Sequence, residues 1–485
     1  MGLFKVLFFA LLVGNVLLRF FTNQVNVLPR FLNLYDVFAT FGLAVLALGH
    51  PRATGATFKT SRIATRLLLF NVVCVCGCLL NWSYVYPMAA LSQLVMWNEP
   101  ILLFLVVVNA PFTLSDVAAY KRLLLRLIAL QVLIGFCQVP TFLRTGASES
   151  IIGTFAGNAE QYQLFVCGGL FYLVAQMEVV QVGQKLRMVM IGAVFALVLL
   201  IDNKASWISL AVALTVIVRR LPTMRAVSAG AFRRLKYYGL LVALGCVGYW
   251  TVTTFSGTAT TKFSNITEAW QTGNIKNLGK IKAARDILTA YTSFGQMALI
   301  GSGLGNFYSR AAFQYFPFRI VDLYMSAPAA GDAAGDSASM AGVITIVTTM
   351  EAFYRRFYER DKIFAIGSGT ADFPTSSYLA LFGECGLLGA FLYLSIYSLV
   401  LRQAKHVLAR ASDDAEFFPL VAAGYALSVY LLCMGAYNFW LDCGRVNTIV
   451  WSLLAISFRY SCLRQEEHPA VLSATEELEA SAVAD

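Results

Sequence analysis

The sequence predicts an all-α membrane protein that crosses the lipid bilayer many times. Of its 485 residues, 58% are hydrophobic and only 13% are charged, and the mean hydropathy is +0.67. This composition excludes an ordinary soluble globular protein. In addition, apolar segments of roughly 20 residues, the length that crosses the ~30 Å hydrocarbon core as a helix, recur from one end of the chain to the other.

Twelve segments have the character of membrane-spanning helices, nine before and three after one long polar stretch. They lie at residues 3–21, 31–49, 64–80, 85–108, 123–139, 161–180, 186–201, 206–218, 238–255, 375–401, 417–435 and 446–458. In the first segment Lys5 precedes the apolar run as in a signal peptide, but no small-residue cleavage site follows. We therefore expect this helix to be retained.

The chain divides accordingly into four parts. We expect residues 1–255 to form a nine-helix transmembrane bundle and residues 256–374 a long loop with amphipathic helices. Residues 375–460 are expected to add a three-helix transmembrane bundle. Residues 461–485 are rich in glutamate, which predicts a disordered acidic tail because such a segment has little apolar surface to bury.

Basic residues in the short loops alternate between the two sides of the membrane. Lys and Arg are retained on the cytoplasmic side, so the richer side marks the cytoplasm. The richer side holds Lys5, Arg52, Lys59, Arg62, Arg66, Lys121, Arg122, Arg126, Lys185, Arg187, Arg219, Arg220, Arg225, Arg233, Arg234, Lys236, Arg402, Lys405, Arg410, Arg459 and Arg464. The short loops and span ends of the other side hold only Arg19, Arg30, Arg144, Lys204 and Arg445. Both termini are therefore predicted to be cytoplasmic and the long loop extracytoplasmic. The net charge of +10 follows from this topology, and we expect no nucleic-acid partner.

The long loop is the only long stretch with room for water-facing chemistry. Its first part, residues 279–299, places apolar residues at helical spacing, which predicts an amphipathic helix at the membrane surface with Arg285 at the edge of the apolar stripe. The sequence GSGLGNF follows at residues 301–307, where the glycines favour a tight turn with positive φ. Because no strand precedes this turn, it does not have the context of a nucleotide-binding fingerprint.

The second part of the long loop combines a flexible insertion with a basic helix. Residues 326–342 consist mainly of small residues, and residues 343–364 have helical periodicity. Arg356 and Arg360 lie one turn apart on the polar face of that helix, where forked donors can hold phosphate oxygens. Contact with the anionic headgroups of membrane lipids explains this pair equally well.

Charged residues within or beside the spans are expensive and therefore often functional. Glu384 lies just inside the tenth span, among Gly383, Gly386 and Gly389, which allow a neighbouring helix to approach closely. It is a candidate catalytic base, but a buried carboxylate that braces a helix explains it better. Lys204, between two short spans, and Glu160, at the start of the sixth, face the outer side. Snorkelling accounts for Lys204 as well as catalysis does.

The residues predict neither a metal nor a cofactor. His50, His406 and His468 all map to the cytoplasmic side, and the outer side has no paired-acid motif for a divalent cation beside a pyrophosphate. None of the ten cysteines lies in the long loop. Cys74, Cys76 and Cys78 alternate along a helix and point to different faces, so we interpret them as packing residues and expect no disulfide framework.

Four segments in order resemble the superfamily of bacterial O-antigen polymerases and O-antigen ligases. They are IIGTFAGNAEQYQLF at 151–165, LLIDNKASWISLAVAL at 199–214, AARDILTAYTSFGQMALIGSGLGNF at 283–307 and PTSSYLALFGECGLLGAF at 374–391. The resemblance covers most of the chain and implies a glycosyltransferase-C-like (class B) architecture in the bacterial inner membrane, with the long loop in the periplasm.

The resemblance implies a metal-independent, inverting glycosyltransferase without a cofactor. A glycan on a polyprenyl pyrophosphate would be transferred to the terminal sugar hydroxyl of another lipid-linked repeat unit, with a flippase and a chain-length regulator as partners. Arg285 would stabilise the leaving pyrophosphate. A second cation would come from Lys204 or from the loop arginines. Those arginines are Arg310, Arg355, Arg356 and Arg360. Candidate bases are Asp372, Glu160 and Glu384.

Two positions depart from the family's pattern. Lys204 stands where the family has an arginine, and Thr375 and Ser376 stand where it often has histidine and asparagine. The missing histidine favours a polymerase over a ligase, while Ser376 remains a candidate substrate contact. A ligase that transfers finished glycan to a lipid or protein is the alternative within the superfamily. A transporter or flippase for lipid-linked oligosaccharides is the alternative from another class, although flippases have short loops and carry their charges inside the bundle.

Overall fold

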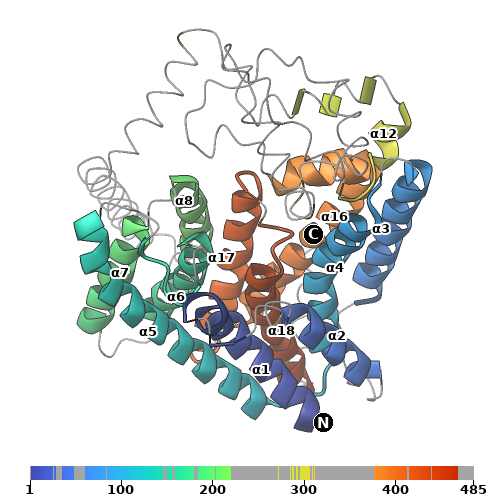
Figure 1. Cartoon of the computed structure of the whole chain (residues 1–485). Coiled ribbons are helices and arrows are strands. Elements are labelled where there is room, and N and C mark those ends of the chain that lie inside the picture. The colour runs from blue at the N-terminus through green and yellow to red at the C-terminus, as the bar shows by residue number, and fades with distance from the viewer. Residues whose placement is uncertain are drawn as a thin grey trace, which may run out of the picture.

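The computed structural model of the chain is a bundle of helices (Figure 1). It describes residues 2–25, 27–28, 35–48, 60–82, 85–145, 150–155, 159–179, 184–201, 204–219, 271, 284–285, 287–288, 291–292, 295–305, 309, 311, 376–411, 414–438 and 440–467. Within these residues the structure contains helices and no strand. The all-α class predicted from the composition is confirmed.

Most of the helices overlap the predicted apolar segments. In chain order they are α1 (Gly2–Arg19) with a π-helical end (Phe20–Gln24), α2 (Tyr35–Leu48), α3 (Thr60–Leu80), α4 (Pro87–Val108), α5 (Leu114–Thr145), α6 (Ala159–Val179), α7 (Gln184–Leu200), α8 (Lys204–Val218), α12 (Gly295–Ile300), α16 (Ser377–Arg410), α17 (Phe418–Gly435) and α18 (Gly444–Glu467). Helices α5, α16 and α18 extend beyond the predicted segments, and α12 lies in the long loop. The predicted ninth segment, residues 238–255, lies outside the described residues.

Six of the described helices are long and apolar enough to cross a membrane, namely α3, α4, α5, α16, α17 and α18. Shorter apolar helices lie at Gly2–Leu18, Tyr35–Leu48 and Ser206–Val218. The protein is therefore a helical membrane protein. The count of twelve spans and the side that each terminus faces stay predictions.

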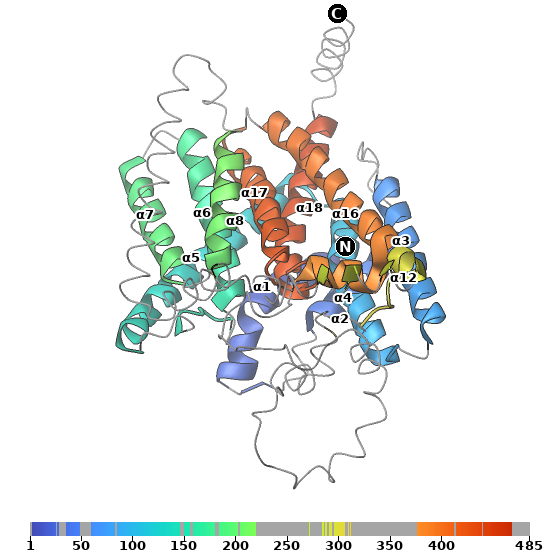
Figure 2. The same ribbon diagram turned by 90° about the horizontal axis from the view of Figure 1, so that it is seen from above.

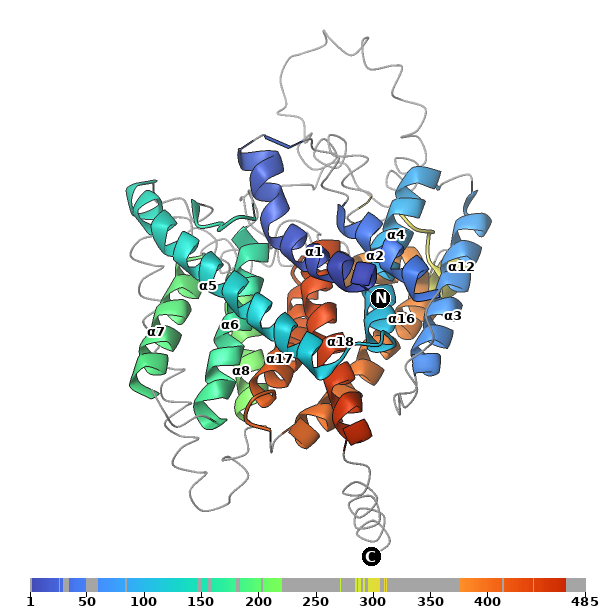
Figure 3. The same cartoon turned by 90° about the horizontal axis from the view of Figure 1, so that it is seen from below.

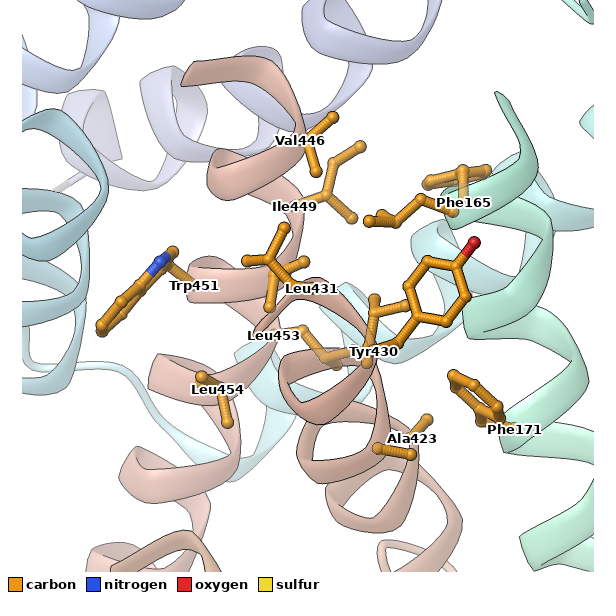
Figure 4. Packing of buried hydrophobic residues seen from close by; sticks show 14 of the residues in the cluster. Phe165, Phe171, Ala423, Tyr430, Leu431, Val446, Ile449, Trp451, Leu453 and Leu454 are labelled. Carbon is orange, nitrogen blue, oxygen red and sulfur yellow. The ribbon is translucent and has the colours of Figure 1, made fainter. Parts of the chain in front are cut away.

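The core of the bundle forms around α17, which packs against α6, α8, α16 and α18. In Figure 4, Tyr430 of α17 points towards Phe165 and Phe171 of α6, while Ile449 and Leu453 of α18 approach from the other side. The rings of Phe171 and Tyr430 meet edge to face with centroids 6.3 Å apart. Edge-to-face packing of this kind fixes helices beyond the gain from burial alone.

Helices α1, α2 and α5 lie along one side of this core, as the view from below shows (Figure 3). Helix α5 contacts α1, α6, α7 and α18. An ion pair between Lys5 and Asp116, with Nζ and Oδ2 2.6 Å apart, joins the first turns of α1 and α5. The N-terminal helix is thus part of the folded bundle.

Helix α16 has a sharp break at Gly386. Its φ of 65° and ψ of −171° are not helical, so the chain changes direction there and continues as a second helix. In Figure 2 the two orange parts of α16 run in different directions, and the first part lies beside α12. The helix starts after Ser376, whose side-chain Oγ accepts a hydrogen bond from the backbone N–H of Leu379 at 3.4 Å, as expected of an N-cap.

Candidate functional site

A short turn from the long loop is buried against the break in α16. This glycine turn, residues 301–305, follows α12 directly, and all five of its residues are buried. The backbone N–H of Ser302 donates to the carbonyl of Gly383 at 2.9 Å, and that of Gly303 donates to the carbonyl of Glu384 at 3.1 Å. The turn therefore satisfies carbonyls that the break in α16 leaves without helical partners.

The glycine turn depends on its glycines for space as well as conformation. Gly301, Gly303 and Gly305 have φ values of 77°, 92° and 70°, which confirms the turn predicted from GSGLGNF. A Cβ on Gly303 would lie 2.7 Å from Val85 Cγ2, and one on Gly305 would lie 2.6 Å from the carbonyl carbon of Ala89. The turn is thus wedged between α4 and α16.

The part of the loop that carries Arg285 is held to the same half of α16. The Tyr291 hydroxyl donates to the carbonyl of Phe382 at 2.6 Å. Burial raises the pKa of Tyr291 to about 12, so the phenol keeps its proton as a donor at neutral pH. Ile287 is buried and its neighbour Leu288 is 63% exposed. Arg285 is exposed.

A polar network continues from the start of α16 towards α6. It consists of Glu160, Asn438, Ser377, Asp442 and Gln93. The half-buried Glu160 accepts a hydrogen bond at Oε2 from Asn438 Nδ2 at 2.9 Å. The carbonyl of Asn438 in turn accepts from the backbone N–H of Ser377 at 3.2 Å. Glu160 is therefore tied to the first residue of α16.

The inner part of the polar network is fully buried. Asp442, in the link between α17 and α18, accepts from Ser377 Oγ at 3.0 Å and from Gln93 Nε2 at 3.1 Å. The opposite end of the Gln93 amide, Oε1, accepts from the backbone N–H of Ala311 at 3.0 Å. Ala311 follows the glycine turn by six residues, so the network and the turn meet beside α4.

The start of α8 lies beside the same end of α6. Gln163 Nε2 donates to the carbonyl of Ile201, three residues before Lys204, at 3.4 Å. The Tyr430 hydroxyl bonds to Ser206, two residues after Lys204. The backbone of Lys204, the first residue of α8, is thus close to the Glu160 end of the polar network. Its side chain lies outside the described ones.

The predicted site residues fall into three groups. Glu160 and the backbone of Lys204 lie at the end of the polar network that leads to the start of α16. Arg285 lies on the loop segment that Tyr291 joins to Phe382 in the first part of α16. Glu384 and Ser376 are buried in α16 and its cap. Glu384 has no exposed surface, which fits a brace better than a base. The remaining candidates lie outside the described residues, namely Arg310, Arg355, Arg356, Arg360 and Asp372.

The Ser376 side chain caps the start of α16 and does not lie on an open surface. Its hydroxyl donates to the carbonyl of Gly435 at 3.1 Å while accepting from Leu379, and it is 2% exposed. A role for Ser376 in binding substrate stays a prediction, and its observed contacts are structural. The sequence reading missed Gln93, Asn438 and Asp442. Asp442 had the clearest signal, because it is an acid between two apolar spans.

The described site offers carboxylates, amides and hydroxyls from several helices, with Arg285 exposed nearby. Within the described residues, no group of three or more His, Cys, Asp or Glu side chains is placed to hold a metal ion. Such a set can orient polar substrates and move a proton without supplying a nucleophile of its own. No protein-family model matches the chain, and no curated protein matches it either.

Proposed function

We propose that the protein is a membrane glycosyltransferase that polymerises glycans carried on polyprenyl pyrophosphate. The observation that supports it best is that four separate segments contact one another in two pairs, which Asn438 connects. Residues 151–165, 199–214, 283–307 and 374–391 carry the resemblance to O-antigen polymerases. The described parts of 151–165 and 199–214 contact each other through Gln163 and Ile201. Those of 283–307 and 374–391 contact each other through Tyr291 and the glycine turn, and Asn438 links Glu160 to the start of α16.

The proposed reaction is an in-line displacement. The hydroxyl oxygen of the acceptor sugar forms a bond to the anomeric carbon of the donor glycan, while the bond from that carbon to the pyrophosphate oxygen breaks. The electron pair leaves with the pyrophosphate, and the hydroxyl proton passes to a base. Arg285, exposed on the loop segment beside α16, neutralises the charge that develops on the leaving group.

Glu160 is the base that we favour among the three candidates. It is half-buried and thus open to substrate on one side, whereas Glu384 has no exposed surface. The hydrogen bond from Asn438 at 2.9 Å fixes one of its oxygens, which leaves the carboxylate oriented. Asp372 lies outside the described residues.

The location follows from the same proposal. Lipid-linked repeat units are polymerised at the periplasmic face of the bacterial inner membrane, so the start of α16 faces the periplasm and both termini face the cytoplasm. The loop-rich side is where a flippase delivers substrate and a chain-length regulator acts. The distribution of basic residues in the short loops supports this orientation.

The test is complementation of a deletion strain with Arg285→Ala and Arg144→Ala. Both arginines are exposed, and both are expected on the periplasmic side, but Arg144 lies in the last turn of α5, away from α16. Loss of one preorganised donor typically lowers the rate by ~10²–10³, so Arg285→Ala should yield single repeat units or short chains, with Arg144→Ala normal. Normal polymer from Arg285→Ala at equal protein level excludes the role of Arg285. Repeat units that accumulate only in the cytoplasmic leaflet would indicate a flippase instead.

A further inference from the structure

Two cysteine thiols from distant parts of the chain meet at the break in α16. Sγ of Cys74 in α3 lies 3.7 Å from Sγ of Cys385 in α16, and 311 residues separate them in the sequence. Both side chains are buried, with exposed fractions of 1% and 0%. No other pair of cysteine sulfurs in the described residues is recorded in such contact.

The position of the thiol pair is unusual within the fold. Cys385 directly precedes Gly386, the residue at which α16 changes direction. One turn further along α3, Cys78 Sγ accepts a hydrogen bond from the backbone N–H of Leu304 in the glycine turn at 3.3 Å. A covalent bond between Cys74 and Cys385 would therefore connect α3 to the joint on which the glycine turn rests.

We propose that Cys74 and Cys385 are an oxidation site at which a disulfide forms and fixes α3 to the break in α16. In this reaction the two thiols release two protons and two electrons, and a bond forms between the two sulfurs. The electron acceptor is a membrane-soluble quinone, which is reduced to the quinol. A disulfide needs the sulfurs at about 2.05 Å, so the two sulfurs have to move closer from a starting position already in contact.

Burial determines which oxidant can act. Each thiol lies on a helix long and apolar enough to span a membrane, and neither sulfur is open to solvent. Because protein atoms cover both side chains, an oxidant reaches them only through transient openings of the bundle. A lipid-soluble quinone or a small uncharged oxidant enters such an apolar opening more readily than a charged, water-soluble one. Cys76 in α3 and Cys137 in α5 are exposed. They serve as internal references, because any membrane-permeant reagent can reach their thiols.

The experiment uses the full chain, purified in lipid nanodiscs in reduced form. It is incubated with a short-chain ubiquinone analogue or with diamide, denatured, alkylated and digested. Mass spectrometry then identifies the cross-linked peptides. We expect a reducible Cys74–Cys385 peptide in wild type, absent from Cys74→Ser and from Cys385→Ser. In the control variant Cys167→Ser, which removes another buried cysteine, the cross-link should form as in wild type.

A second readout needs no variant. Oxidation of wild type should remove two alkylatable thiols, and dithiothreitol should restore both. A charged aqueous oxidant should leave the Cys74–Cys385 pair reduced. The proposal is overturned if both cysteines stay fully alkylatable after quinone and diamide, or if the cross-link joins Cys78 or another cysteine instead.

Discussion

Gly301 and Gly386 lie where two backbone segments pack so closely that neither residue has room for a side chain. A Cβ on Gly386 would lie 2.5 Å from the backbone nitrogen of Gly301, and a Cβ on Gly301 would lie 2.5 Å from the backbone nitrogen of Cys385. Both residues have positive φ, 77° for Gly301 and 65° for Gly386. The joint between the long loop and α16 thus admits no side chain on either partner.

Gly386→Ala should destabilise the protein by at least about 2 kcal/mol. The change adds the cost of a non-glycine residue at positive φ to a clash with backbone atoms of residues 299–301, which cannot move like a side chain. Thermal unfolding in detergent measures the effect. The matched control is Gly295→Ala, in α12 beside the same joint, where a Cβ meets nothing within 4 Å. A Gly386→Ala protein as stable as Gly295→Ala would contradict the interlock.

Asp442→Asn should destabilise the polar network by about 1–3 kcal/mol. Asp442 accepts from both Ser377 Oγ and Gln93 Nε2, and an asparagine would present an NH₂ group to one of these buried donors. A buried donor without an acceptor costs free energy in this range. Thermal unfolding of Asp442→Asn, of Gln93→Leu and of the double variant gives a double-mutant cycle. Strictly additive changes in unfolding free energy would show that the two residues are not coupled.

Glu160→Gln should separate stability from activity. The glutamine oxygen can still accept from Asn438 Nδ2, so the unfolding free energy should change by no more than about 0.5 kcal/mol. Loss of a general base typically lowers the rate by ~10²–10⁴, and polymer formation per unit protein measures it. Glu416→Gln makes the same chemical change at a carboxylate that is 63% exposed. If Glu160→Gln polymerises as fast as this control, Glu160 is not the base.

Asp414 should make the stability of the protein depend on pH on the acid side. Burial alone would raise the pKa of Asp414, but hydrogen bonds from Tyr460, from Arg464 and from backbone N–H groups together lower it below the ordinary value of 3.8. Because the pKa of Asp414 is lower in the folded state than in the unfolded state, its ionised form stabilises the fold at pH values above the unfolded-state pKa. This stability is lost as the pH falls from there through the folded-state pKa.

Asp414→Asn should therefore lower the unfolding free energy at pH 7 by about 1 kcal/mol, because charge-assisted bonds at a partly exposed site contribute only modestly. It should also flatten the decline in thermal stability between neutral pH and the most acidic pH at which the protein stays soluble. The experiment is a pH series of unfolding curves. An unchanged acid-side slope would show that Asp414 does not contribute to it.

The positions of the described apolar helices could be predicted from the sequence because a bilayer requires long apolar segments. The limits of α5 show where this fails. The predicted span covers residues 123–139, but the helix covers Leu114–Thr145. Its first turns contain Lys121 and Arg122, so their hydropathy is too low to be recognised as part of a span. The helix nevertheless starts there because Thr113 and Asp116 cap it through a 2.7 Å hydrogen bond between Oγ1 and Oδ2.

The glycine turn was also predictable, since its positive φ values follow from the spacing of its glycines. Its partner was not. The glycines of α16 predicted the close approach of another helix, and at Gly386 the approaching element is the backbone of residues 299–301. Asp442 and Gln93 are 349 residues apart in the chain, and Cys74 and Cys385 are almost as distant. Hydropathy and spacing carry no information about such pairings, which depend on how the helices are arranged in space.

The most direct test of the proposed function uses the purified protein in lipid nanodiscs with a single repeat unit linked to polyprenyl pyrophosphate as the only substrate. Mass spectrometry of the glycans and of the released lipid follows the reaction. Polymerisation predicts products longer by whole repeat units, with one free polyprenyl pyrophosphate for each new linkage, and little product from Arg285→Ala. Repeat units that remain single, in a preparation whose unfolding curve is that of the folded protein, would contradict the proposal.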